Sequence, residues 1–209
     1  MKNLIRKLNN IQLVLKKKGY FPLEGSASIE QINCIIRIIK KNKILNICEV
    51  GFNAGFSSFA FLASNISVKV TSFDIGDHGY IKFAKKIIDS KFHGRHRLIL
   101  GDSKKSIPKF CKKHPKIRFD LIFIDGGHDY KTARSDLINM KKLSTKETVV
   151  IMDDIIPWLN WGKGPSKAWL ELIKKGIVSQ DKLYKDGKLV NKIKPPGSRG
   201  WAVGKYIFK

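Results

Sequence analysis

The chain has 209 residues, 43% of them apolar, which is enough for one hydrophobic core and makes a single domain the expectation. No stretch approaches the roughly 18 consecutive apolar residues of a membrane-spanning helix, and three scattered cysteines without a CxxC pair argue against a disulfide framework or a zinc site. The 41 Lys and Arg against 17 Asp and Glu give a formal net charge of +24.

This charge has two interpretations. Clustered basic residues neutralise phosphates, so a nucleic-acid partner is one of them. The other is a solvated, lysine-rich surface that follows from a biased composition. The second is favoured, because 34 of the basic residues are Lys, mostly in scattered pairs, and no Arg-rich arm or RNP-like aromatic motif interrupts them. Such a field still attracts polyanions.

The N-terminal segment predicts a helix over residues 2–18, from apolar residues spaced like one face of a helix. It lacks the continuous apolar centre and cleavage site of a signal peptide, and the cysteines fit reduced thiols, so a cytoplasmic location is expected. A turn follows, and Ser26 or Ser28 can cap a second helix over 29–42.

Five short β-branched runs follow, separated by helix-length segments. They are ILNICEVG (44–51), VKVTSFDI (68–75), HRLILGD (96–102), FDLIFIDG (119–126) and TVVIMDD (148–154). Their continuous apolar character predicts strands covered on both faces, as in the parallel sheet of an α/β fold. The C-terminal part of the sequence has a different pattern. Residues 177–190 and 199–208 predict two more strands without a crossover helix, which indicates a final antiparallel hairpin.

Carboxylates stand at the end of every predicted parallel strand. They are Glu49, Asp74, Asp102, Asp125, Asp153 and Asp154. One such residue is uninformative, because polar residues commonly follow strands. A series of them is not, because ligands of an open parallel sheet bind in the crevice beyond the carboxyl ends of its strands.

Each carboxylate has a candidate role if the ligand contains adenosine. Asp74, 23 residues after Gly51, stands where a doubly wound fold places the acid that accepts hydrogen bonds from ribose hydroxyls. Asp102, with Ser103, can receive the adenine amino group on the next strand. The backbone of Asn53–Ser57 opens a helix whose N–H groups can bind a carboxylate of the ligand.

The stretch EVGFNAGFSS at 49–58 reads as a strand end and a helix start with two glycines between them. A dinucleotide fingerprint needs GxGxxG, but Asn53 and Phe56 stand at its second and third glycine positions. A P-loop needs GxxxxGK[ST], and no lysine stands at the required place. The remaining pattern, EVGFNAG, resembles motif I of the class I S-adenosylmethionine-dependent methyltransferases.

The resemblance runs from about residue 20 to the C-terminus. Its motifs are EGSAS, EVGFNAGFSS, GDS, FDLIFIDGGHDY, DL (Asp136–Leu137), IMDDI, GPSKAW and RGWAVGKYIF. They are similar to small class I enzymes that include catechol-type and macrolide-sugar O-methyltransferases. The resemblance implies a Rossmann-like, seven-stranded, mostly parallel sheet with an antiparallel last strand and helices on both faces. It also implies one methyltransferase domain over 1–209, with a helical extension at 1–42 and a catalytic α/β core at 43–209.

The same resemblance implies where S-adenosylmethionine binds. Together with the roles argued above, the candidate residues are Glu49, Gly51, Asn53, Gly55, Ser57, Asp74, Asp102, Ser103 and Asp125. Phe56 departs from the pattern, since many relatives have His there; the change affects packing near the methionine end.

The far strand ends imply the chemistry of methyl transfer. In metal-dependent catechol-type relatives, Mg²⁺ is held by residues that match Asp125, Asp153 and Asp154, and oxygen ligands of this kind suit Mg²⁺. The relatives' general base stands three residues after the first ligand, where this chain has His128, so His128 and Asp125 are the candidate catalytic residues. The alternatives are a local turn role for His128 and a capping or loop-anchoring role for the aspartate pair.

The leading hypothesis is O-methylation of a small hydroxyl-bearing molecule, with Trp158, Trp161 and Trp169 shaping the acceptor pocket and Trp201 packing the sheet. RNA methylation, favoured by the net charge, ranks lower, because its Lys-Asp-Lys-Glu set would need Lys43, Asp125, Lys167 and Glu171 to meet. A non-catalytic binding module is the third hypothesis, and the intact strand-end acids argue against it.

Overall fold

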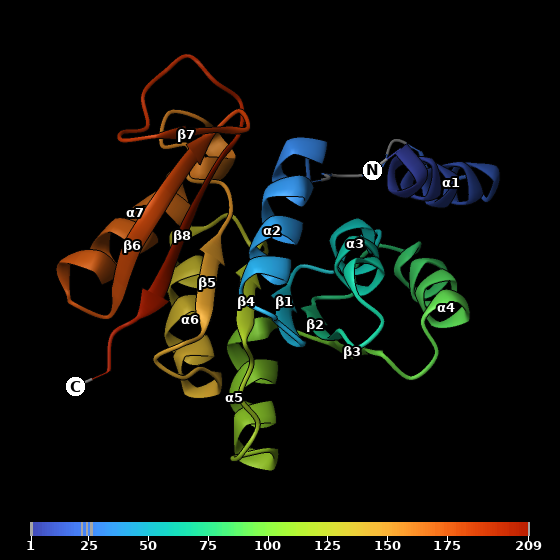
Figure 1. Ribbon diagram of the computed structural model, residues 1–209, viewed down its shortest axis with the longest axis horizontal. Helices are drawn as coiled ribbons and strands as arrows, with labels where there is room; N and C mark the ends of the chain where they lie inside the picture. The colour runs from blue at the N-terminus through green and yellow to red at the C-terminus, as the bar shows by residue number, and fades with distance from the viewer. Residues whose placement is uncertain (1, 22, 24, 26, 209) are drawn as a thin grey trace.

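The structure is a computed structural model that describes residues 2–21, 23, 25 and 27–208. One sheet runs through it with helices on both faces (Figure 1). The helices are α1 (Lys2–Lys17), α2 (Ile29–Lys41), α3 (Phe56–Ser64), α4 (Ile81–Lys91), α5 (Ser103–Lys113), α6 (Tyr130–Met140), the 3₁₀ turn η1 (Lys141–Leu143) and α7 (Asn160–Lys174). The strands are β1 (Asn46–Val50), β2 (Lys69–Asp74), β3 (His96–Leu100), β4 (Leu121–Ile124), β5 (Val149–Met152), β6 (Val178–Lys185), β7 (Lys188–Val190) and β8 (Gly200–Tyr206).

The predicted parallel part of the sheet is confirmed. Strand β1 pairs in parallel with β2 and β4, β2 pairs with β3, and β4 pairs with β5. The strand order is β3-β2-β1-β4-β5-β8-β6-β7. The carboxyl ends of β1 to β5 therefore meet at one edge of the sheet, which is the arrangement that the strand-end acids require.

The sheet has eight strands rather than seven. Strand β8 lies between β5 and β6 and is antiparallel to both, as predicted for the last strand. The additional strand arises because the predicted strand over 177–190 is a hairpin of β6 and β7. Its turn is Asp186–Gly187, with φ of 47° for the aspartate and 81° for the glycine. Positive φ at both turn residues matches the twist of the flanking strands, and Asp-Gly is the pair that tolerates it.

Two hydrophobic clusters fill the two faces of the sheet. Side chains of α1, α2, α3 and α4 pack on one face, and those of α5, α6 and α7 pack on the other. Along β4, Leu121 and Phe123 point to the first cluster, while Ile122 and Ile124 point to the second. Successive side chains of a strand alternate between faces, so burial of both faces produces the continuous apolar runs of the sequence.

Helix α2 begins as the sequence predicts. Ser28 is its N-cap, and its side chain accepts a hydrogen bond from the backbone N–H of Gln31 at 3.1 Å. Ser26, the other predicted cap, lies outside the described residues. Within the part of the chain that is described, no helix is both long enough and apolar enough to cross a membrane.

Candidate active site

The glycines after β1 make room for the protein's own atoms. Gly51 has a φ of 94°, and a Cβ at this position would lie 1.8 Å from the backbone oxygen of Asp125. Gly55 starts α3 in the left-handed conformation, with φ of 76°, and a Cβ there would lie 3.0 Å from the Phe52 ring. Neither close approach leaves space for a side chain, so both glycines are required before any ligand is considered.

Glu49 is fully buried inside a network of hydroxyl groups. Its carboxyl accepts hydrogen bonds from Ser57 and Ser58 at the start of α3, and from Ser72 of β2 at 2.6 Å. Ser72 also lies 3.0 Å from Nε2 of His96. Burial raises the pKa of Glu49 to about 7, while the three hydroxyls act in the opposite direction. Glu49 and Ser57, both predicted to bind the cofactor, thus bind each other and fix the first turn of α3.

Asp74 holds the glycine loop at the end of β2. One carboxylate oxygen accepts from the backbone N–H groups of Phe52 and Asn53, both at 2.8 Å, and the other accepts from Gly76 at 2.8 Å. The side chain of Asn53 in turn accepts a hydrogen bond from the Tyr80 hydroxyl at 2.6 Å. A carboxylate that accepts several N–H bonds is held in one orientation at the sheet edge.

Asp102 and Ser103 lie at the start of α5, as expected. Asp102 is the N-cap of this helix and accepts from the backbone N–H of Lys104 at 3.0 Å. Two large apolar side chains beside these acids were missed by the sequence reasoning: Ile75 is 64% exposed and Leu100 is 58% exposed. The signal was present, since each stands at the end of a strand next to a candidate acid.

Four predicted residues follow β4 and β5 at the carboxyl edge of the sheet. They are Asp125, His128, Asp153 and Asp154. Burial, together with the charges of Asp153 and Asp154, raises the pKa of Asp125 well above its ordinary value. Burial and then the neighbouring Asp154 raise the pKa of Asp153 to about 7. Asp154 directs a carboxylate oxygen to Nε2 of His128 at 3.0 Å. The structure therefore brings all four predicted residues together and pairs the histidine with one of the acids.

The metal site that the resemblance implies at Asp125, Asp153 and Asp154 stays a prediction. Across the described ranges, no group of three or more His, Cys, Asp or Glu side chains is placed so that it could hold a metal ion. Asp154 turns toward His128, Asp153 is buried, and Asp125 is half-buried. No step of the chemistry below is assigned to magnesium.

Known proteins resemble this chain both in sequence family and in fold. Residues 48–155, just over half of the chain, match a family model described as a methyltransferase domain. The chain belongs to this methyltransferase family. The predicted resemblance to class I methyltransferases is confirmed, and with it the prediction of an enzyme. No curated protein matches the sequence significantly.

Solved methyltransferase structures share the fold of this methyltransferase. The O-methyltransferase of Bacillus cereus, in complex with SAH, is 17% identical with a TM-score of 0.73, over 95% of this chain and 90% of that one. TomG of Streptomyces achromogenes, an O-methyltransferase in complex with SAM, is 13% identical with a TM-score of 0.74, over 95% and 88%. CalS11, a TDP-rhamnose 3′-O-methyltransferase, is 16% identical with a TM-score of 0.62, over 96% and 91%. At these identities, the likeness establishes the fold.

The predicted site of the methyltransferase lies inside the matched range, but two of its neighbours do not. The Arg199 guanidinium, just before β8, acts to lower the pKa of Asp125 and Asp153. The Gln31 amide, from α2, lies beside Asp153 and acts in the same direction. Arg199 is the first residue of the motif RGWAVGKYIF, although that motif assigns it no role, and Gln31 carries no sequence signal, because a Gln in a helix is ordinary.

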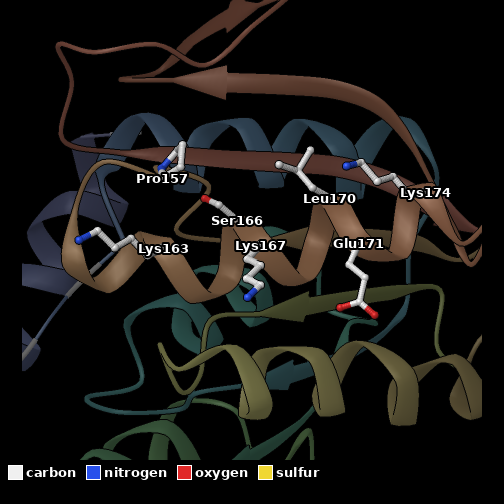
Figure 2. A pocket seen from close by; sticks show the side chains of 7 residues that line it. All are labelled: Pro157, Lys163, Ser166, Lys167, Leu170, Glu171 and Lys174. Atoms are coloured by element: carbon white, nitrogen blue, oxygen red, sulfur yellow. The ribbon is translucent and has the colours of Figure 1, made fainter.

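A cavity of about 460 Å³ lies along α7 (Figure 2), and none of the predicted cofactor or metal residues lines it. Its lining residues are Pro157, Lys163, Ser166, Lys167, Leu170, Glu171 and Lys174. In Figure 2 the amines of Lys163, Lys167 and Lys174 point in different directions, so they do not converge on one anion. We assign no ligand to this cavity.

The Lys-Asp-Lys-Glu set required for RNA 2′-O-methylation is not formed. Lys43 precedes β1, whereas Asp125 follows the parallel strand β4, so the two lie at opposite edges of the sheet. Glu171 binds Arg134 at 3.1 Å and Lys175 at 2.6 Å. This set was wrong because sequence spacing alone does not say at which end of a strand a residue lies.

One of the tryptophans predicted to shape the acceptor pocket is a core residue instead. Trp169, expected at the acceptor pocket, is fully buried and donates to the Gln180 side chain at 2.9 Å. Trp201 is also buried and stacks on Tyr184, as predicted for a packing residue. Trp158 donates to the backbone oxygen of Gly197 at 3.1 Å.

Proposed function

We propose that this methyltransferase transfers a methyl group from S-adenosylmethionine to a hydroxyl group of a small acceptor. The observation that carries the proposal is the pair of His128 and Asp154, 3.0 Å apart, at the ends of neighbouring strands β4 and β5. A histidine oriented by a carboxylate is the arrangement of a general base. It lies at the same sheet edge as Asp74 and Asp102.

The residues at the ends of β2 and β3 fit an adenosine group. Asp74 offers oxygens to ribose hydroxyls, and Asp102 with Ser103 can accept from and donate to the adenine edge. Ile75 and Leu100 offer exposed apolar surface for the faces of the base. The backbone N–H groups at the start of α3, set by Gly55 and the Glu49 network, suit the carboxylate of the methionine part.

The bound cofactor supplies an electrophilic methyl group on its sulfonium. The task of the chain is to orient the acceptor hydroxyl and remove its proton. With Nε2–H donating to Asp154, Nδ1 of His128 carries the lone pair that accepts this proton, and the carboxylate of Asp154 stabilises the resulting imidazolium. Asp125 is half-buried beside the pair, and desolvation with the charges of Asp153 and Asp154 raises its pKa.

RNA is the alternative acceptor, and the net charge of +24 is the observation in its favour. The two acceptors are separated by one assay. Calorimetric titration with S-adenosylhomocysteine tests the cofactor site, and methyl transfer from labelled S-adenosylmethionine is measured on catechol, TDP-rhamnose and an RNA transcript. Transfer to a small compound supports the proposal, and transfer to RNA alone overturns it.

The role of His128 has a matched test. His128→Ala should lower turnover by roughly 10²- to 10⁴-fold, the usual contribution of a general base, and leave the affinity for S-adenosylhomocysteine unchanged. His93, an exposed histidine before β3, is the control, and His93→Ala should keep full turnover. Equal turnover of the two variants would remove His128 as the base.

A further inference from the structure

Gln31 is a fully buried glutamine that the function proposed above does not use. It lies in the first turn of α2 and is 0% exposed. Neither its amide nitrogen nor its amide oxygen has a hydrogen-bond partner among the described residues. A buried amide without partners destabilises a protein, because both groups give up their bonds to water on folding. An unpartnered amide of this kind calls for a functional explanation.

Helix capping does not supply that explanation. The spacing of Ser28 and Gln31 matches a capping box, in which the side chain of the third helical residue bonds back to the N–H of the cap. Only one half of this box is formed. The Ser28 hydroxyl accepts from the backbone N–H of Gln31 at 3.1 Å, but the Gln31 side chain makes no return bond.

The side chain turns instead toward the end of β5. The Gln31 amide lies beside the Asp153 carboxyl, close enough to influence it but short of hydrogen-bond geometry. Asp153 is itself buried, and one of its oxygens accepts from the backbone N–H of Asp154 at 2.8 Å. Asp154 in turn pairs with His128 at 3.0 Å. Gln31 therefore stands behind the His128–Asp154 pair, with Asp153 between them.

A carboxamide suits this place, because it can donate through its nitrogen or accept through its oxygen. It can thus hold a carboxyl group in either protonation state without adding a charge. We propose that Gln31 is a positioning residue of the methyl-transfer site, which orients the Asp153 carboxyl beside the His128–Asp154 pair when the acceptor binds. The role rests on the function proposed above.

The proposal predicts opposite effects on stability and turnover. In Gln31→Leu, a side chain of similar size without polar atoms removes the unpartnered amide, so the Tm should rise, by roughly 2–4 °C. Turnover should fall, by about 10-fold or more in kcat/KM for catechol as the first probe, because Asp153 is no longer held. The affinity for S-adenosylhomocysteine should not change. Gln31→Glu keeps the shape but places a second carboxylate beside Asp153, so it should lose turnover as well.

Gln180 offers a matched control. Its side chain accepts a hydrogen bond from the buried Trp169 indole at 2.9 Å, and Gln180 is none of the candidate site residues. Gln180→Leu should lower the Tm, because Trp169 loses its partner, and should leave kcat/KM unchanged. If Gln31→Leu behaves like Gln180→Leu, Gln31 is a structural residue and the proposal is overturned.

A second readout needs no acceptor. In ¹⁵N-labelled protein, the side-chain amide signals of Gln31 can be assigned by their absence from Gln31→Leu. They should shift in Asp153→Asn and stay in place in Asp181→Asn, where the aspartate is exposed on β6. If the wild-type protein methylates none of the test compounds, the proposed function fails. The amide signals then test by themselves whether Gln31 contacts Asp153. Unchanged Gln31 signals in Asp153→Asn would overturn the proposed positioning.

Discussion

At the scale of single residues, the role of the motif EVGFNAG depends on where its side chains point as well as on which residues they are. The space in front of Gly51 is filled by the Asp125 backbone, which holds the ends of β1 and β4 together. Glu49 points away from the crevice into a set of serine hydroxyls. The motif therefore builds the scaffold that presents Asp74 and the start of α3, and its glutamate acts from within the fold.

The buried Glu49 makes stability depend on pH. Its pKa is about 7 when folded, against an ordinary value of 4.5, so the folded state binds the extra proton between these values. Its contribution to the free energy of unfolding is full below pH 4.5, falls as the pH rises to about 7, and is flat above that, with a total fall of up to about 3 kcal/mol. Glu49→Gln removes this titration. The stability of the variant relative to wild type should therefore increase between pH 5 and pH 8, as measured by urea unfolding.

Glu147 provides the comparison for Glu49, because its side chain is largely exposed and lies 3.6 Å from the Lys205 amine. The difference between Glu147→Gln and wild type should change little over the same pH range. A constant difference for Glu49→Gln as well would show that the buried carboxyl does not titrate in this window.

At the scale of elements, the loops that follow β2 and β3 form one side of the proposed cofactor site. Asp74 ties the loop after β1 to the loop after β2 through three backbone N–H groups. Ile75 follows Asp74 directly, and a Cβ on Gly76 would lie 3.4 Å from the Leu100 side chain, so the loop after β2 packs against Leu100. Exposed apolar surface of this kind beside hydrogen-bonding groups is typical of a ligand site.

Ile75→Ser tests this surface. Since Ile75 is 64% exposed, the substitution should leave the Tm unchanged. If the adenosine group covers this side chain, its loss should weaken the binding of S-adenosylhomocysteine by about 1.5 kcal/mol, which is roughly tenfold in Kd. Ile66, 85% exposed in the turn before β2, is the matched control, and Ile66→Ser should bind normally in the same calorimetric titration. Equal affinities of the two variants for S-adenosylhomocysteine would show that Ile75 does not contact the cofactor.

The elements that the sequence predicts are those with a local signal. The strands β1 to β5 follow from continuous apolar runs, and the acids at their ends follow from position alone. The strand β7 was missed although Asp186–Gly187 is a hairpin signal, because β7 has only three residues, Lys188–Val190, which is too short for a periodic pattern. The pairing of Asp154 with His128 and the approach of Gln31 depend on loop direction and on contacts between distant segments. No pattern in a single chain specifies these.

At the scale of the whole molecule, the net charge is far from zero, and basic residues stand at both ends of several helices. No acidic residue stands in the first turn of α3, α4, α5, α6 or α7. Lysines stand in the first turns of α4 to α7, as Lys82 does in α4, although the partial positive charge of a helix N-terminus favours acids. Self-repulsion of a net charge of +24 adds to this effect.

The two effects can be separated on one helix. Lys82 and Lys91 are both exposed and lie in the first and last turns of α4, so Lys82→Glu and Lys91→Glu lower the net charge equally. Both relieve self-repulsion, but only Lys82→Glu also improves the interaction with the helix dipole, by about 0.3–1 kcal/mol at low salt. Lys82→Glu should therefore have the larger free energy of unfolding at 20 mM NaCl, and the gap should shrink at about 1 M NaCl, where the screening length is about 3 Å. Equal stabilities at low salt would mean that net charge alone governs the effect, whereas a gap that persists at high salt would point to local packing around Lys82 and its contact with the Phe83 ring.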